Sequence, residues 1–178
     1  MGRGFADRAA MAGGVLIVVL VFLVRCDPAY PPPPPFRAWA GLPVSGSLAD
    51  AGRAGFGDCL SDNIRLRCRR SGVHLLGLGP YEAAVDMAGR DGRAGFDHFT
   101  LWVRDDQNAV QAVGKRLRAR GWSVCYTGVG NRGDQAIHTR PGVAVQVTVD
   151  LSYWMKRRLR IFPQASPNKP VCTRSNQF

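Results

Sequence analysis

Glutamate and lysine are nearly absent from this sequence of 178 residues. It contains one glutamate, Glu82, and three lysines, so a catalytic pair of glutamates is excluded. The remaining carboxylates are aspartates, and most of them lie in expected turns and helix caps. Arginine carries the positive charge, because 24 Lys and Arg residues face 13 Asp and Glu residues, a formal net charge of +11.

The sequence also lacks the short motifs of common catalytic and metal sites. There is no GxSxG nucleophile elbow, no P-loop, and no CxxC or CxxxC pair of the kind that zinc fingers use. Residues 128–133 match GxGxxG, but strands rather than a phosphate-binding helix are expected to follow them. These absences favour a protein that is not an enzyme and holds no cofactor.

One long uncharged run lies near the N-terminus, at residues 9–24 between Arg8 and Arg25. As a helix it would reach about 24 Å, against about 30 Å for a membrane core. The alternatives are a cleaved secretory signal and a buried core helix. Because no small-x-small cleavage site follows promptly, we expect residues 1–26 to form an uncleaved single-pass anchor in the cell membrane.

A proline-rich stretch follows the apolar run. Five consecutive prolines at residues 31–35 predict a polyproline II rod, which serves either as a stalk or as a ligand for a proline-binding domain. Residues 38–57 are rich in Gly, Ala and Ser. We therefore expect residues 27–57 to be stalk and linker, residues 58–163 to form the globular domain, and residues 164–178 to be a basic C-terminal tail.

The globular region predicts an α+β domain with a mostly antiparallel sheet and one main helix. Val110, Val113 and Leu117 form an apolar helical stripe, with Asp105 or Asp106 as its cap and Gly121 at its end. Alternating valines at residues 143–149 predict a strand. From residue 96 onward the expected order is β-α-β-β-β.

Four cysteines lie beyond the apolar run, and an even number permits disulfides in an oxidising compartment. Three connectivities remain open, of which we favour Cys59–Cys68, closing a short loop, and Cys125–Cys172, fixing the tail. Cys26 is left over. The basic residues flanking the apolar run do not decide its orientation, but the cysteines favour a domain on the periplasmic or extracytoplasmic side.

Residues 151–178 carry six basic and no acidic groups. Arginines beside aromatic residues suit phosphate or carboxylate binding, so an anionic envelope lipid or a protein partner is expected here. Nucleic acid is a candidate partner only if the domain lies in the cytosol. The alternative is a solvated basic edge strand. The predicted ligand-binding residues are Lys156, Arg157, Arg158 and Arg160.

His98 lies in an expected strand, Asp97–Val103, and this strand with the β-α-β-β-β order resembles one module of the vicinal oxygen chelate superfamily. The resemblance covers only residues 96–150 and includes no second module. It implies a metal site formed by His98, His138 and a carboxylate, either Asp150 or Glu82. The alternative for each histidine is a half-buried structural role.

The sequence therefore predicts a membrane-anchored, extracytoplasmic binding or structural module of the cell envelope, with a basic C-terminal edge for an acidic ligand or partner. The alternative is a small metal-dependent enzyme that resembles a single vicinal oxygen chelate module.

Overall fold

The computed structural model describes residues 30–152, 154 and 156–164. The expected anchor and, apart from Gln164, the expected tail lie outside these residues. Within the described part of the chain, no helix is long and apolar enough to cross a membrane.

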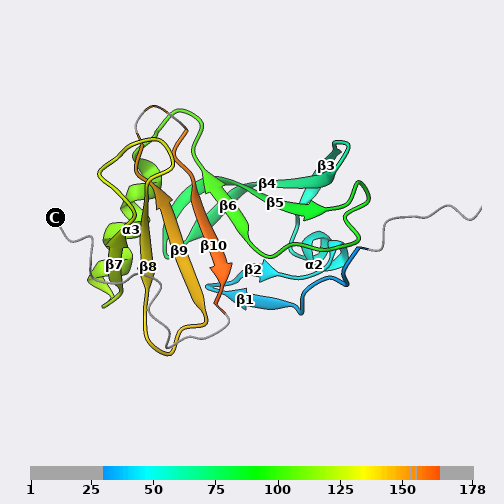
Figure 1. The fold of residues 1–178 in the computed structure, drawn as a ribbon, viewed down its shortest axis with the longest axis horizontal. Coiled ribbons are helices and arrows are strands. Elements are labelled where there is room, and N and C mark those ends of the chain that lie inside the picture. Colours follow the sequence, from blue (N-terminus) through cyan, green and yellow to red (C-terminus); the bar gives the residue numbers. More distant parts are fainter. Residues whose placement is uncertain (1–29, 153, 155, 165–178) are drawn as a thin grey trace, which may run out of the picture.

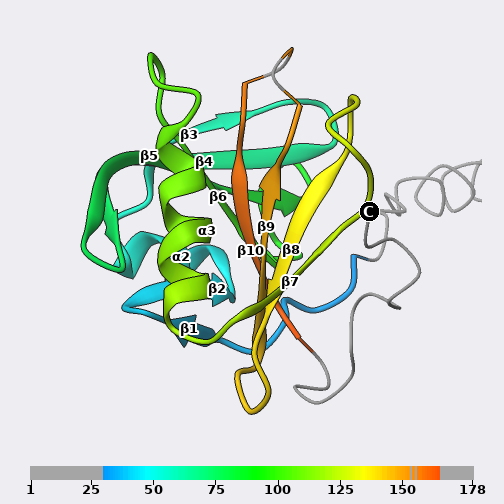
Figure 2. The ribbon, with the colours of Figure 1, turned by 90° about the vertical axis from the view of Figure 1, so that its left-hand side faces the viewer.

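An eight-stranded antiparallel sheet dominates the fold, with one main helix, α3, packed against it (Figures 1 and 2). This confirms the predicted mostly antiparallel α+β architecture. A separate hairpin, β1–β2, and a short helix, α2, complete the domain. The elements are β1 (Arg37–Trp39), β2 (Leu42–Ser45), α2 (Leu48–Arg53), β3 (Gly57–Ser61), β4 (Arg65–Leu75), β5 (Leu78–Ala88), β6 (Phe99–Trp102), α3 (Ala109–Ala119), β7 (Ser123–Tyr126), β8 (Gln135–Thr139), β9 (Val145–Asp150) and β10 (Leu159–Pro163).

The sheet has two unlike faces, which we call the covered face and the polar face. Strand residues alternate between them. On the covered face, the buried stripe of α3 (Val110, Val113 and Leu117) joins one core with apolar residues of the central strands. These strand residues are Ala83, Val85, Phe99, Leu101, Val147, Val149, Leu159 and Ile161. The polar face carries the intervening residues, among them Arg67, Asp86, Asp150 and Arg160.

The main helix begins later than the sequence suggested. Its N-cap is Asn108, whose side chain makes no capping hydrogen bond, rather than Asp105 or Asp106. Gly121 follows the helix with a φ of +78°, the left-handed conformation that a C′ glycine adopts readily.

Residues 38–57, expected to be linker, form β1, β2 and α2 instead. Leu42, Val44 and Ala51 are buried in the core, so this segment belongs to the folded unit. A capping box starts α2, in which Ser47 and Asp50 bond each other's backbone amides. Composition misled the prediction here, because small residues suit tight packing as well as linkers.

The last prolines of the proline run contact the domain. The Ser45 hydroxyl donates a 2.8 Å hydrogen bond to the carbonyl oxygen of Pro35. A Cβ built on Gly95 would lie 2.7 Å from the Cβ of Pro33, so only glycine permits this approach. The chain therefore enters the domain along its surface at these residues.

The position of β10 corrects a second expectation. This strand pairs with β6 on one side and β9 on the other, so it is an interior strand and not a basic edge (Figure 1). The edges of the large sheet are β3 and β7. The observed order from β6 is β-α-β-β-β-β, one strand more than expected.

Candidate anion-binding site

The predicted basic cluster is divided between the two sides of the sheet. The Arg157 side chain is buried, with its guanidinium bonded to the side-chain oxygen of Asn108. The Arg157 amide donates a 2.6 Å hydrogen bond to the side-chain oxygen of Gln107, so this residue ties the segment before β10 to the segment that leads into α3. Lys156 is exposed. Arg158 and Arg160 lie on the opposite, polar face, because a strand sends alternate residues to opposite sides.

Arg160 is occupied by an acidic neighbour. Its Nη1 atom lies 2.8 Å from Oδ1 of Asp150, and both side chains are largely shielded from solvent. Asp150 also accepts a hydrogen bond from the backbone amide of Arg158, at 3.3 Å. This aspartate therefore neutralises Arg160 and holds the backbone from which the Arg158 side chain extends.

A cavity of about 400 Å³ lies on the polar face, and we call it the arginine pocket. Residues from β3, β4, β5 and the β3–β4 connection form it together with one arginine that directly precedes β10. Its lining residues are Leu60, Ser61, Asp62, Arg65, Arg67, Asp86 and Arg158.

Two of the three arginines in this pocket have acidic partners. Arg67 makes two hydrogen bonds of 2.6 Å to the two carboxylate oxygens of Asp86 across the β4–β5 register. This hydrogen bonding raises the pKa of Arg67 and fixes the plane of its guanidinium. Arg65 lies 3.4 Å from Asp62, and both of these side chains are about half exposed.

Arg158 differs from its two neighbours in the pocket. Its guanidinium has no ion pair or hydrogen bond to any residue that the structure describes. Its backbone is nevertheless held by Asp150, so the side chain starts from a fixed point. The pocket thus presents one uncompensated positive charge beside two neutralised guanidinium groups, which suits a single carboxylate or phosphate group.

A disulfide borders the arginine pocket. Cys59 and Cys68 are bonded, as predicted, and join the exposed edge strand β3 to β4. Leu60 and Arg67, which line the pocket, adjoin these two cysteines and face each other in the β3–β4 register. Cys125 is also disulfide-bonded. Its predicted partner Cys172 lies outside the described residues, as does Cys26, so that pairing stays a prediction.

The residues of the alternative metal site lie in separate environments. The Nδ1 atom of His98 lies 2.7 Å from Asp97, and its ring stacks on Phe162 at 4.8 Å between centroids. That hydrogen bond lowers the pKa of Asp97. Glu82 accepts a 2.8 Å hydrogen bond from Ser71, and Asp150 pairs with Arg160 as described.

His138 is almost completely buried on the covered face. A Cβ built on Gly114 of α3 would lie only 2.9 Å from its Nε2 atom. Burial lowers the pKa of His138 to about 4, and the positive charge of Arg118 adds to the effect. Within the described ranges, no three His, Cys, Asp or Glu residues are grouped as metal ligands would be.

Comparison with known proteins gives no relative. The chain matches no protein-family model, and neither the curated proteins nor the solved structures yield a significant match. The geometry of the site itself is therefore the basis for inferring function.

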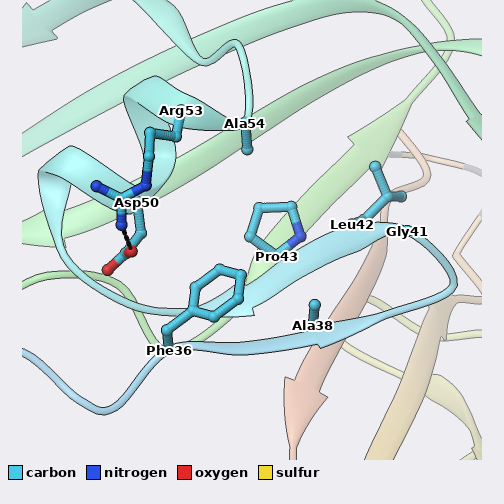
Figure 3. A pocket seen from close by; sticks show the side chains of 8 residues that line it. All are labelled: Phe36, Ala38, Gly41, Leu42, Pro43, Asp50, Arg53 and Ala54. Atoms are coloured by element: carbon cyan, nitrogen blue, oxygen red, sulfur yellow. Dashed lines mark hydrogen bonds and ion pairs between the residues drawn. The ribbon is translucent and has the colours of Figure 1, made fainter.

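A further cavity of about 450 Å³ lies between the β1–β2 hairpin and α2 (Figure 3). Its two charged residues, Asp50 and Arg53, form an ion pair with each other, and Asp50 also caps α2. The rest of its lining is Phe36, Ala38, Gly41, Leu42, Pro43 and Ala54. Because its charged groups already satisfy each other, this cavity offers a ligand little beyond apolar contact.

The basic C-terminal sequence points to Arg158 but not to the residues that surround it in the structure. The alternation Ile64-Arg65-Leu66-Arg67-Cys68 indicated that Arg65 and Arg67 share a face of one strand. Nothing in the pattern indicated that the side chain of Arg158 would meet that face, because this depends on the order of strands in the sheet.

Proposed function

We propose that this chain is a membrane-anchored, extracytoplasmic binding module of the cell envelope, and that it binds an acidic group in the arginine pocket. The proposal covers a binding role without catalysis. Support for the anchor comes from the uncharged run at residues 9–24. Support for the outside location comes from the Cys59–Cys68 disulfide, since such bonds are rare in the reducing cytosol.

The observation that carries the binding proposal is the state of Arg158. It lines a cavity of about 400 Å³ and has no acidic partner among the described residues. An arginine that lacks a partner can bind an anion without first breaking an ion pair, and because its backbone is already held in place, the ordering cost falls on the side chain alone.

The recognised chemistry is a single carboxylate or phosphate monoanion. Asp62 and Asp86 already lie in the pocket, so the net charge of its lining is +1 from three arginines and two aspartates. A group with several negative charges would meet repulsion from both aspartates. The acidic group of an envelope lipid or of a partner protein fits this pattern.

The test uses the full chain in an uncharged detergent, titrated with acetate and with inorganic phosphate. NMR of the arginine Nε–Hε groups reports on each guanidinium. We expect the Arg158 resonance to shift saturably, and Arg158→Gln to weaken binding by about tenfold because a charge-assisted hydrogen bond is lost.

Lys156→Gln is the matched control, since it removes the same charge two residues away from an exposed site outside the pocket. It should leave affinity unchanged, and both variants should melt at the same temperature as the parent chain. Equal weakening by both substitutions would reduce the effect to net charge and overturn the proposed site. The absence of any saturable shift would overturn it as well.

A further inference from the structure

A second cavity, of about 170 Å³, lies at the end of α3 that leads into β7, and we call it the tryptophan pocket. Five separate segments of the chain contribute to it: β1 and its turn, the β4–β5 turn, α3, the approach to β7, and the β8–β9 connection. Six of its lining residues carry the argument: Trp39, Leu76, Leu117, Arg120, Trp122 and Arg140.

Two indole rings form the aromatic part of this pocket. Trp39 and Trp122 pack edge to face, with ring centroids 5.5 Å apart and an angle of 66° between planes. Trp122 is buried in the core, while Trp39 is partly exposed. Edge-to-face contact is a preferred arrangement of aromatic rings, and a third flat ring can extend it.

Two guanidinium groups complete the lining, and no acidic residue accompanies them. Arg120 and Arg140 are exposed, and neither forms an ion pair with any residue in the described part of the chain. Like charges that approach one cavity repel each other, so an anion between them would relieve that repulsion. This contrasts with the arginine pocket, where two aspartates share the lining.

The backbone around the pocket is also unusual. Three described non-glycine residues adopt a positive φ, and two of them, Ala40 at +51° and Leu76 at +55°, line this cavity. Each occupies the first of two left-handed positions in a hairpin turn, where Asn, Asp or Gly is preferred. Such conformations are costly and concentrate at functional sites.

We infer that the tryptophan pocket is a second binding site, for a small aromatic carboxylate. The aromatic ring packs against Trp39, and the carboxylate accepts hydrogen bonds from Arg120 and Arg140. This site is distinct from the arginine pocket and does not depend on the function proposed there.

The size of the cavity limits the ligand. Pockets for drug-sized molecules measure about 300–1,000 Å³, and this one is smaller. It therefore suits one ring with one acidic group rather than an extended chain.

The experiment uses the full chain, in uncharged detergent, labelled with fluorotryptophan and followed by ¹⁹F NMR. Four tryptophans give four signals, which single Trp→Phe substitutions assign. Three probes separate the two halves of the proposed ligand: benzoate has ring and charge, benzyl alcohol has the ring alone, and acetate has the charge alone. We expect benzoate to shift the Trp39 and Trp122 signals saturably, and the other two probes to bind at least tenfold more weakly.

Arg120→Gln and Arg140→Gln should each weaken benzoate binding by about tenfold. Arg116→Gln, one helical turn earlier on α3 and outside the pocket, is the matched control and should change nothing. Equal binding of benzyl alcohol and benzoate would overturn the inference, as would equal binding by the arginine variants and the parent chain. A saturable benzoate shift of another tryptophan signal that leaves the Trp39 and Trp122 signals unchanged would place binding outside this pocket and would also overturn the inference.

Discussion

The two faces of the large sheet differ in how their polar side chains are accommodated. On the covered face, the His138 side chain is buried against α3, and its Nδ1 atom has no hydrogen-bond partner in the described structure. On the polar face, charged residues pair across strands, as in Arg67 with Asp86 and Arg160 with Asp150.

Because of this difference, we expect residues of the covered face to determine stability and residues of the polar face to determine binding. A buried polar group without a partner favours its neutral form and close packing around it. Paired charges at a partly exposed face contribute little to stability, but they orient side chains for a ligand. Changes on the covered face should therefore unfold the protein, and changes on the polar face should alter what it binds.

The largest expected difference in stability between the two faces is that between alanine substitutions of two phenylalanines on neighbouring strands. Phe99 is fully buried on the covered face, whereas Phe162 stacks on His98 on the polar face and stays partly exposed. Phe99→Ala should lower the free energy of unfolding by about 3–5 kcal/mol. Phe162→Ala should cost clearly less, as measured by chemical denaturation. Equal losses would show that both faces pack as core and would end the distinction drawn above.

Acidification should act through His138. Its pKa is about 4 in the folded chain and 6.5 ordinarily, so between these values the unfolded state binds the proton and the folded state does not. Stability is therefore complete above pH 6.5, falls as the pH drops toward 4, and is lower by up to about 3 kcal/mol there. Denaturation at a series of pH values measures this slope. His138→Leu should flatten it, and an unchanged slope would assign the pH dependence to other groups.

The smallest of these effects tests the contact between α3 and His138. Glycine to alanine inside a helix normally stabilises by about 0.5–1 kcal/mol. Gly114→Ala should instead destabilise by about 1–3 kcal/mol, because its Cβ would meet the His138 ring at 2.9 Å. Gly52→Ala in α2, where a new Cβ meets nothing within 4 Å, is the control and should be neutral or stabilising. The melting temperatures of the two variants test this prediction. Equal changes in melting temperature would mean that the His138 ring can move to accept the new methyl group.

Local patterns in the sequence predicted local structure well. The apolar stripe of α3 and the alternating valines of β9 are buried as their periodicity predicts, since periodicity reflects which side of an element faces the core. The short spacing of Cys59 and Cys68 likewise indicated their pairing.

The sequence suggests one basic patch at residues 156–160, yet Arg157 and Arg158 project to opposite sides, which alternation of neighbouring residues could have revealed. Features set by the order of strands, in contrast, were not predictable. That β10 would lie inside the sheet could not be seen, because pairing partners are distant in the chain. The tryptophan pocket was missed for the same reason, as its residues come from five segments.

The interior position of β10 also bears on the order in which the domain can assemble. β3 to β6 form one run of neighbouring strands and β7 to β9 form another, and β10 alone joins them. It is the last of the eight in chain order, so during synthesis β6 and β9 each lack a neighbour on one side until residues 159–163 emerge. Strand pairing that is completed late, between residues far apart in the chain, slows folding. Until then, β6 and β9 each expose an unpaired edge. For the extracytoplasmic location that we propose, such a delay would help the chain to be exported before it folds.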